Sequence, residues 1–453
     1  MTEKPPRGYA FVRALSRFLL GIFYQRIEVV GAENVPPEGP LVVTANHHNA
    51  IVDAMLLMTA FRRPLRVLAN APLFRHPAIG PFLRLVGALP VNRRQEAGDD
   101  PRKNAALFAA TTEALRAGHA IALFPEGRTQ PEPALQTVRT GAARMVLAAE
   151  AEGARGVALL PVGLVFDEPG TFRSGRALVL VGSPVDTDGL AGRDPAADPA
   201  AARELTERLA EALRAQIVET DDRQTLRLLK LVEELWRDRD DAPPPPDGVR
   251  VLWLQGAARA HRELRESAPE RLAAFRRRLE AYDAACEEAG LSAQLLSRWY
   301  TPASVARYAA SQGLSLLVGL PLALVGVLVH GLPYRLTGFA VRRVPHTDEE
   351  EATDKIVGGL VFYPLCWIAE GWAVHALFGR TALIAFLIAV PLTAFPALAW
   401  YERLENVKTE AAAFARFLRN RELLSRLRKE RRELSEELHA LAALAGSGEA
   451  GRA

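Results

Sequence analysis

The chain has 453 residues, and its 56 lysines and arginines against 53 aspartates and glutamates give a formal net charge of +3. This length allows two or three domains. So small a net charge, without a recognised nucleic-acid motif, argues against nucleic-acid binding. The two cysteines, Cys286 and Cys366, argue against a disulfide framework. No Cys and His residues have the spacing of a metal site, so no metal is expected.

The first predicted element is an amphipathic helix within residues 1–30. Aromatic and aliphatic residues, among them Phe11 and Phe18, recur with helical spacing between residues 9 and 24, and two arginines lie off that stripe. The segment is too short and too charged to span a bilayer, so it is predicted to lie on a membrane surface. A helix that faces the core of its own domain would have the same pattern, and one helix can do both.

A buried strand predicted at residues 40–45 ends in a polar loop that contains His47 and His48, and Asp53 follows shortly after. A carboxylate can keep one imidazole nitrogen protonated, so that the other nitrogen can take a proton from a hydroxyl group. The segment is therefore a candidate for general-base catalysis. The alternative is an ordinary helix start, with Asn49 or Asp53 capping backbone N–H groups.

Three further apolar runs lead into chemically informative residues at 87–94, 121–129 and 157–164. Taken singly, arginines after a strand are usually solvated and a Pro-Glu-Gly sequence is an ordinary turn. Four such blocks in succession are hard to explain in that way. The residues that these three blocks contribute are Arg93, Arg94, Glu126, Gly127, Arg128, Thr129 and Pro161.

Together the four blocks resemble the motifs of the glycerolipid acyltransferase family, which comprises glycerol-3-phosphate and 1-acylglycerol-3-phosphate acyltransferases. The resemblance extends over about residues 30–185, and the His-x4-Asp spacing of the first motif is met by His48 and Asp53. The chain is most similar to the yeast-type glycerol-3-phosphate/dihydroxyacetone-phosphate acyltransferase branch. That branch has asparagines around the histidine, a pattern that selects His47, and a Phe-Arg-Ser step, found here at 172–174. Both histidines therefore stay candidates, and the branch pattern favours His47.

The resemblance implies transfer of an acyl group from a thioester, acyl-CoA or acyl-ACP, to a hydroxyl group of a glycerol phosphate. His47 or His48 would be the base, and Asp53 would orient it. Arg93 would bind the phosphate, with Arg128 second and Arg139 a weaker candidate. Glu126, Gly127, Thr129 and Pro161 complete the implied substrate-binding set. No cofactor is implied, because the thioester is a co-substrate, and no covalent intermediate is needed.

The chain-wide pattern predicts an α/β class: a layered acyltransferase domain with a central mostly parallel sheet, followed by a helical region and C-terminal transmembrane helices. Strand and helix signals alternate over residues 31–190, the predicted catalytic domain. Residues 200–300 are predicted to form a helical bundle or hairpin. Residues 402–453 are predicted to form a charged C-terminal helix and tail.

Residues 308–401 are predicted to be a transmembrane region. Three apolar runs, at 314–332, 356–378 and 381–400, each approach the roughly 20 residues that cross a bilayer. A tight turn at Gly379 and Arg380 joins the last two runs. The sequence thus predicts a glycerol-3-phosphate O-acyltransferase of phospholipid synthesis in the cell inner membrane, with its catalytic domain facing the cytoplasm. The alternatives are acylation of 1-acylglycerol-3-phosphate, or a catalytically idle membrane scaffold that binds lipid.

Overall fold

The computed structural model describes residues 6, 8–92, 101–130, 132–166, 175–237, 247–289, 302–343, 350–419 and 421–450. The chain divides into two compact units. The first, here called the sheet unit, takes its residues from Met1–Leu226, Pro245–Gln255 and Pro345–Val357. The second, here called the helical unit, takes its residues from Arg227–Pro244, Gly256–Val344 and Gly358–Ala453. The domain boundaries inferred from the sequence stay predictions.

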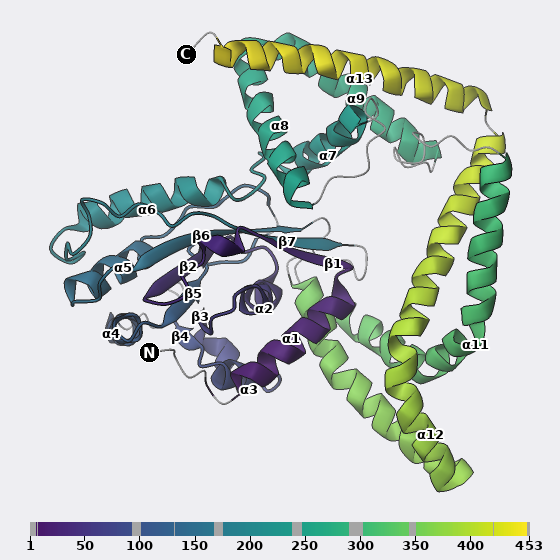
Figure 1. The fold of residues 1–453 in the computed structure, drawn as a ribbon, viewed down its shortest axis with the longest axis horizontal. Coiled ribbons are helices and arrows are strands. Elements are labelled where there is room, and N and C mark those ends of the chain that lie inside the picture. Colours follow the sequence, from purple (N-terminus) through teal and green to yellow (C-terminus); the bar gives the residue numbers. More distant parts are fainter. Residues whose placement is uncertain are drawn as a thin grey trace. The chain divides into compact units, whose positions relative to one another are not determined.

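The sheet unit is built on a sheet that has seven strands in the described residues, in the order β1-β7-β6-β2-β5-β3-β4 (Figure 1). Only the β6–β7 pair is antiparallel, and the other neighbours are parallel. The mostly parallel α/β sheet predicted from the sequence is thereby confirmed. The strands are β1 (Arg26–Val30), β2 (Leu41–Ala45), β3 (Leu65–Asn70), β4 (Leu89–Val91), β5 (Ala120–Leu123), β6 (Ala158–Phe166) and β7 (Arg176–Val181).

Helices cover both faces of this sheet, which explains why its central strands read as continuous apolar runs rather than as alternating ones. Along β2, Leu41 and Val43 belong to one core, with helices α1 and α2, whereas Val42 belongs to the other core, with α4, α5 and α6. The helices of this unit are α1 (Tyr9–Phe23), η1 (Ala32–Asn34), α2 (Ala50–Ala60), η2 (Ala71–Arg75), α3 (Gly80–Leu85), α4 (Pro101–Arg116), α5 (Gly141–Ala151) and α6 (Pro199–Arg214).

Helix α1 buries one face and exposes another. Its buried residues include Tyr9, Val12 and Leu20, which pack into the core beside α2. Phe11 and Phe18 are 61% and 52% exposed. The helix therefore has the core-facing role that the sequence left open, and it keeps an apolar face for the predicted membrane contact.

Helix α2 is apolar around most of its circumference, as expected of a helix buried in a core. Its sequence, AIVDAMLLMTA, contains a single charged residue, Asp53, which is fully buried in the first turn. A charge so deeply buried needs partners. The partners of Asp53 define the candidate site.

The helical unit contains a pair of charged helices and two long apolar ones. Arg278 on α9 forms ion pairs with Glu430, Glu433 and Glu437 on α13. Helices α7, α8 and α12 begin in the sheet unit and continue into this one. The helices are α7 (Arg223–Arg237), α8 (Asp247–Ser267), α9 (Pro269–Ala289), α11 (Pro302–Val341), α12 (Glu351–Arg419) and α13 (Arg421–Ala450).

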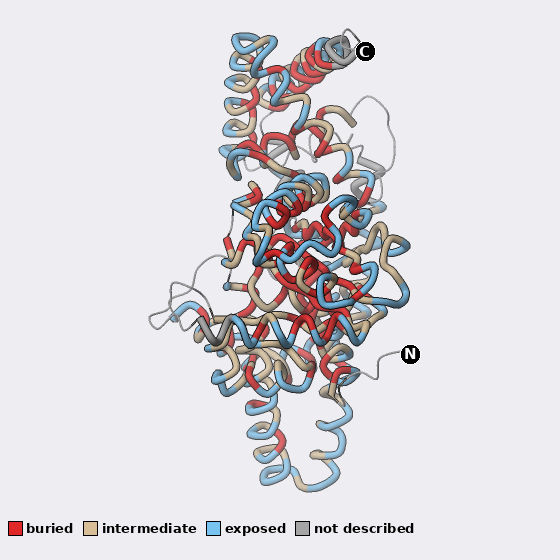
Figure 2. Tube along the Cα trace, turned by 90° about the vertical axis from the view of Figure 1, so that its left-hand side faces the viewer, coloured by how far each residue is buried: buried red, intermediate tan, exposed pale blue. Residues whose placement is uncertain are grey.

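Two helices within the described residues, Ala310–Val341 and Glu351–Ala412, are long and apolar enough to cross a membrane. Gly379 has a non-helical backbone that divides α12 into two halves, as the predicted turn requires. Trp400, in the second half, donates a hydrogen bond of 2.8 Å to the carbonyl of Leu316 on α11. Much of this apolar hairpin is pale blue, that is exposed, at the foot of Figure 2. The evidence for membrane association is the length and the apolar composition of these helices.

Candidate active site

The loops that follow β2 and β5 lie side by side because these strands are parallel neighbours. The backbone N–H of Gln130 donates to the carbonyl of His47 at 3.0 Å. The N–H of His47 donates in turn to Oε1 of Glu126 at 3.0 Å. The structure thus brings together two blocks that the sequence separates by 79 positions.

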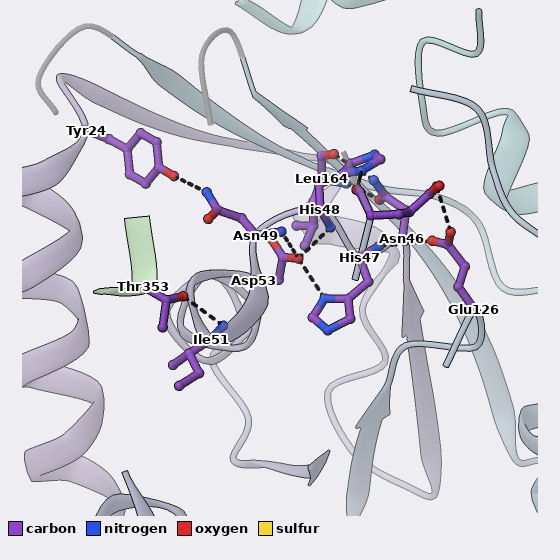
Figure 3. A network of polar contacts seen from close by, with 11 residues as sticks. Tyr24, Asn46, His47, His48, Asn49, Ile51, Asp53, Glu126, Leu164 and Thr353 are labelled. Carbon is purple, nitrogen blue, oxygen red and sulfur yellow. Dashed lines mark hydrogen bonds and ion pairs between the residues drawn. The ribbon is translucent and has the colours of Figure 1, made fainter. Parts of the chain in front are cut away.

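The ring of His47 is held by Asp53. Its Nδ1 lies 2.8 Å from Oδ2 of Asp53 (Figure 3). A carboxylate oxygen accepts, so Nδ1 carries the proton and Nε2 keeps a lone pair. The ring also stacks on Phe124, with centroids 4.0 Å apart and planes 10° apart. Within the described residues Nε2 has no hydrogen-bond partner, which leaves it able to accept a proton from a substrate.

Asp53 also organises the start of its own helix. The same Oδ2 atom accepts hydrogen bonds from the backbone N–H groups of His48 and Asn49, both at 2.8 Å. Three donors on one ionised oxygen form charge-assisted hydrogen bonds, and a carboxylate in the first turn also suits the positive end of the helix dipole. The capping contacts of Asp53 are thereby shown, and its contact with His47 is compatible with the catalytic role, which stays a prediction.

His48 has a different environment from His47. Its ring Nδ1 donates to the carbonyl of Gln130 at 2.8 Å rather than to a carboxylate. A carbonyl fixes the tautomer but supplies no full negative charge to stabilise an imidazolium ion. The contact with the Asp53 carboxylate distinguishes His47 from His48, and the choice of the base between them stays a prediction.

Two asparagines hold the histidine loop from either side. The side chain of Asn46 donates to the carbonyl of Leu164 at 2.9 Å and accepts from its N–H at 2.7 Å, which extends the β2–β6 pairing beyond the strand. Asn49 donates to the hydroxyl group of Tyr24 at 2.8 Å. Burial, and then the charge of Asp53, raise the pKa of Tyr24, so this hydroxyl stays neutral.

Glu126 is buried, and both its carboxylate oxygens accept hydrogen bonds from the protein. Besides the N–H of His47 on Oε1, Oε2 accepts from Nε2 of Gln130 at 3.1 Å and from the N–H of Gln136 at 3.2 Å. These contacts give Glu126 a clear role in holding the two loops together. Its contact with a substrate hydroxyl stays a prediction.

Burial raises the pKa of Glu126, and this predicts a pH-dependent stability. A carboxyl group whose pKa is raised from 4.5 by folding binds its proton more tightly in the folded state. The stabilisation that comes from this tighter proton binding is fully present below pH 4.5 and is lost as pH rises through the pKa of the folded state. Relative to Glu126→Gln, the wild-type free energy of unfolding should therefore fall as pH rises, by at most about 1.4 kcal/mol per pH unit.

Denaturant unfolding in detergent between pH 4 and pH 8 would check this. The exposed Glu132→Gln change on the same loop is the matched control, and its difference from wild type should stay flat. A wild-type advantage over Glu126→Gln that grows with pH would show that the ionised carboxylate stabilises the fold.

Two guanidinium groups flank the glycine of the third block. Gly127 has φ +72°, a backbone conformation that favours glycine, and a Cβ atom built there would lie 3.0 Å from Nε of Arg139. Arg139 is exposed, and so is Arg128, which donates to Oε1 of Gln136 at 2.9 Å. Thr129 is half-buried.

Arg93, Arg94 and the Phe-Arg-Ser step at 172–174 lie outside the described residues. Strand β4, which ends just before Arg93, is separated from β2 by β5 and β3. At about 4.8 Å for each strand step, the ends of β2 and β4 are about 14 Å apart.

Pro161 lies inside β6 and is buried. It pairs in register with Thr44 of β2. Its carbonyl accepts a hydrogen bond of 2.9 Å from the N–H of Gly182, directly after β7. Its role in substrate binding stays a prediction.

Several residues that support the site were not predicted from the sequence. They differ in whether any local sequence pattern could have indicated them. Gln130 directly follows a recognised block, so its position alone could have suggested it. Tyr24 closes the first amphipathic helix and carried no signal of its own. Thr353, which contacts the backbone of Ile51, is 302 positions away, and no local pattern could have indicated it. Within the described ranges, no group of three or more His, Cys, Asp or Glu residues is placed to hold a metal ion.

Residues 26–165 match the family model described as Acyltransferase. The predicted glycerolipid acyltransferase family is supported by its relatives. The chain is 28% identical over 157 residues to a 1-acyl-sn-glycerol-3-phosphate acyltransferase of Borreliella burgdorferi, covering 35% of this chain and 58% of the relative. It is 24% identical over 169 residues to the chloroplastic 1-acyl-sn-glycerol-3-phosphate acyltransferase LPAT1 of Arabidopsis thaliana, covering 36% and 44% respectively.

Among solved structures, the chain is similar to the 1-acyl-sn-glycerophosphate acyltransferase PlsC of Thermotoga maritima, with 20% identity and a TM-score of 0.34. That match covers 46% of this chain and 80% of the other. The chain spans 58% and 44% of the two curated relatives' lengths. The finer resemblance to the yeast-type branch stays a prediction.

Proposed function

We propose that this chain transfers a fatty acyl group from acyl-CoA or acyl-ACP to a hydroxyl group of glycerol 3-phosphate. The observation that carries this proposal is the contact of 2.8 Å between His47 Nδ1 and Asp53 at the carboxyl end of β2, within the residues that match the acyltransferase family model. A buried carboxylate behind an imidazole is the arrangement that lets the far nitrogen act as a base.

In the proposed reaction, Nε2 of His47 takes the proton of the acceptor hydroxyl as its oxygen attacks the thioester carbonyl. Asp53 stabilises the imidazolium ion that forms. When the tetrahedral intermediate collapses, the carbon–sulfur bond breaks and the imidazolium returns its proton to the departing thiolate. The products are the acylated glycerol phosphate and the free thiol, and the enzyme regains its starting state.

The phosphate of the acceptor requires fixed positive charge near this histidine. Arg128 and Arg139 flank Gly127 on the loop that is hydrogen-bonded to the histidine loop, and both are exposed. Guanidinium groups bind phosphate through two parallel hydrogen bonds. We propose that these two arginines bind the phosphate together with Arg93, and that Thr129 and Pro161 lie near the acceptor.

Removing one of these guanidinium groups should weaken acceptor binding. Arg139→Ala is expected to raise the KM for glycerol 3-phosphate about tenfold, the loss of a charge-assisted contact worth about 1.5 kcal/mol, with kcat changed less. Steady-state kinetics on purified protein measure both constants. Arg155→Ala is the matched control, because this exposed arginine precedes the start of β6 and so lies at the amino ends of the parallel strands, away from the histidine loop. Equal effects of the two changes would exclude Arg139 from the phosphate site.

A second candidate function is acylation of 1-acyl-sn-glycerol-3-phosphate, and the names of two relatives favour it. The same base and phosphate contacts serve both acceptors. The two differ in the acyl chain already present on the acceptor, which needs an apolar surface beside the site.

The products carry fatty chains, which fits a chain held in a bilayer. We propose that the apolar halves of α12, with α11 beside them, are membrane-embedded, and that Phe11 and Phe18 contact the bilayer surface. The catalytic domain would lie on the cytoplasmic side of the cell inner membrane, where the thioester and the glycerol phosphate are found.

An assay of the purified full chain in detergent tests the function. Labelled acyl-CoA and acyl-ACP would be offered with glycerol 3-phosphate, 1-acylglycerol-3-phosphate and other lysophospholipids. Preference for glycerol 3-phosphate supports the first candidate, and preference for the 1-acyl form replaces it with the second. No transfer to any acceptor would leave the lipid-binding scaffold as the function.

A further inference from the structure

The first turns of α12 belong to the sheet unit, although the rest of that helix does not. Ala352 is fully buried and Ile356 is 8% exposed, and both are members of the core that contains α1 and α2. In sequence, this short segment follows α11 and opens the second long apolar helix. The start of that helix therefore supplies part of the core of the sheet unit.

One side chain of this segment contacts the backbone next to the candidate site. Oγ1 of Thr353 accepts a hydrogen bond of 3.2 Å from the N–H of Ile51 (Figure 3). Ile51 is in the first turn of α2, where backbone N–H groups have no partner within the helix. Thr353 is 8% exposed, so the hydroxyl replaces water that would otherwise bind this N–H group.

The backbone that Thr353 contacts is strained. Ala50, just before Ile51, has φ +41°, the only positive φ of a non-glycine residue in the described chain. A residue in such a conformation costs about 1–3 kcal/mol and persists only where its surroundings fix it. Asp53 binds the N–H groups on one side of Ala50, at His48 and Asn49, and Thr353 binds the N–H group on the other side.

We propose that Thr353 is a positioning residue for the His47–Asp53 pair. By binding the N–H group of Ile51, it fixes the first turn of α2, and this turn places Oδ2 of Asp53 against both His47 and the histidine loop. The segment that carries Thr353 belongs to the sheet unit and leads directly into the apolar part of α12, so the support for the catalytic pair lies at the start of a proposed membrane helix. The kinetic part of this inference rests on the proposed acyl transfer.

The test compares substitutions at Thr353 in the full chain. Thr353→Val keeps the shape but removes the acceptor, and it is expected to lower kcat about tenfold while the acceptor KM stays within about twofold, because a misplaced base slows chemistry more than binding. Thr353→Ser keeps the hydroxyl and should restore kcat to within about threefold of wild type. Thr59→Val is the matched control, since its hydroxyl donates within α2 at the opposite end of that helix.

Hydrogen–deuterium exchange provides a readout that needs no substrate. Amide groups of residues 47–53 should exchange faster in Thr353→Val than in wild type, Thr353→Ser or Thr59→Val, while the remaining amides keep their protection. If Thr353→Val does not fold, Thr353→Ala replaces it.

An unchanged exchange rate at 47–53, or equal losses of kcat in Thr353→Val and Thr353→Ser, would overturn the inference. Faster exchange in a chain whose wild type transfers no acyl group would reject the proposed function and keep the contact's structural role.

Discussion

Replacing His47 with alanine is expected to lower kcat about 10²–10⁴-fold, the usual contribution of a general base, whereas His48→Ala should retain activity within about tenfold. The reason is the different partner of each ring. His47 donates to the carboxylate of Asp53, which can stabilise the imidazolium ion, and His48 donates to the carbonyl of Gln130. Steady-state kinetics with saturating thioester and acceptor would measure both variants.

Folding has to be shown separately, because both histidines lie in a loop that connects β2 to α2. Far-ultraviolet circular dichroism and the thermal midpoint of each variant in detergent provide that control. His47→Gln is a useful companion, since its amide can still donate to Asp53 but cannot act as a base. If His48→Ala were the inactive variant and His47→Ala the active one, the assignment of the base would be reversed.

Much of the sheet could be predicted because its strands are buried on both faces. Runs such as those at 40–45 and 157–164 are apolar without alternation, and the first leads into the candidate residues His47 and His48. Parallel strands place their carboxyl ends at one edge. Because β2 and β5 are also neighbours in the sheet, His47 and Glu126 come close together.

The partners of these residues could not be predicted in the same way. Whether Glu126 faces a substrate or the N–H of His47 depends on how the loop turns at Gly127. The hydrophobic periodicity of the sequence does not indicate that loop conformation. The choice between His47 and His48 depends on the ring orientations, which Phe124 and Gln130 determine.

Contacts from distant segments lie beyond any local pattern. Thr353 lies in a charged stretch just before the apolar run at 356–378, and its burial beside α2 follows from tertiary packing. The same is true of α1, whose periodicity indicated an amphipathic helix but could not tell the core-facing residues from the exposed Phe11 and Phe18.

Asp53 is expected to show the second large effect, divided between catalysis and stability. Asp53→Asn keeps an oxygen that can accept from the backbone but removes the negative charge, and it should lower kcat about 10³–10⁴-fold, as in other carboxylate–histidine pairs. Asp53→Ala removes the acceptor of three buried donors, on His47, His48 and Asn49. Each donor left without a partner costs about 1–3 kcal/mol, so this variant should lose several kcal/mol of unfolding free energy.

Measuring kcat and denaturant unfolding on the same preparations separates the two roles. Asp198→Ala is the matched control, because Asp198 caps α6 in the same unit by accepting from the N–H groups of Ala200 and Ala201, away from the histidine loop. That change should lower stability and leave kcat unchanged. An Asp53→Asn protein with near wild-type kcat would mean that His47 works without a charged partner, and the mechanism proposed here would be wrong. Because one oxygen atom of Asp53 serves both the base and the start of α2, we expect no single substitution at Asp53 to preserve both functions.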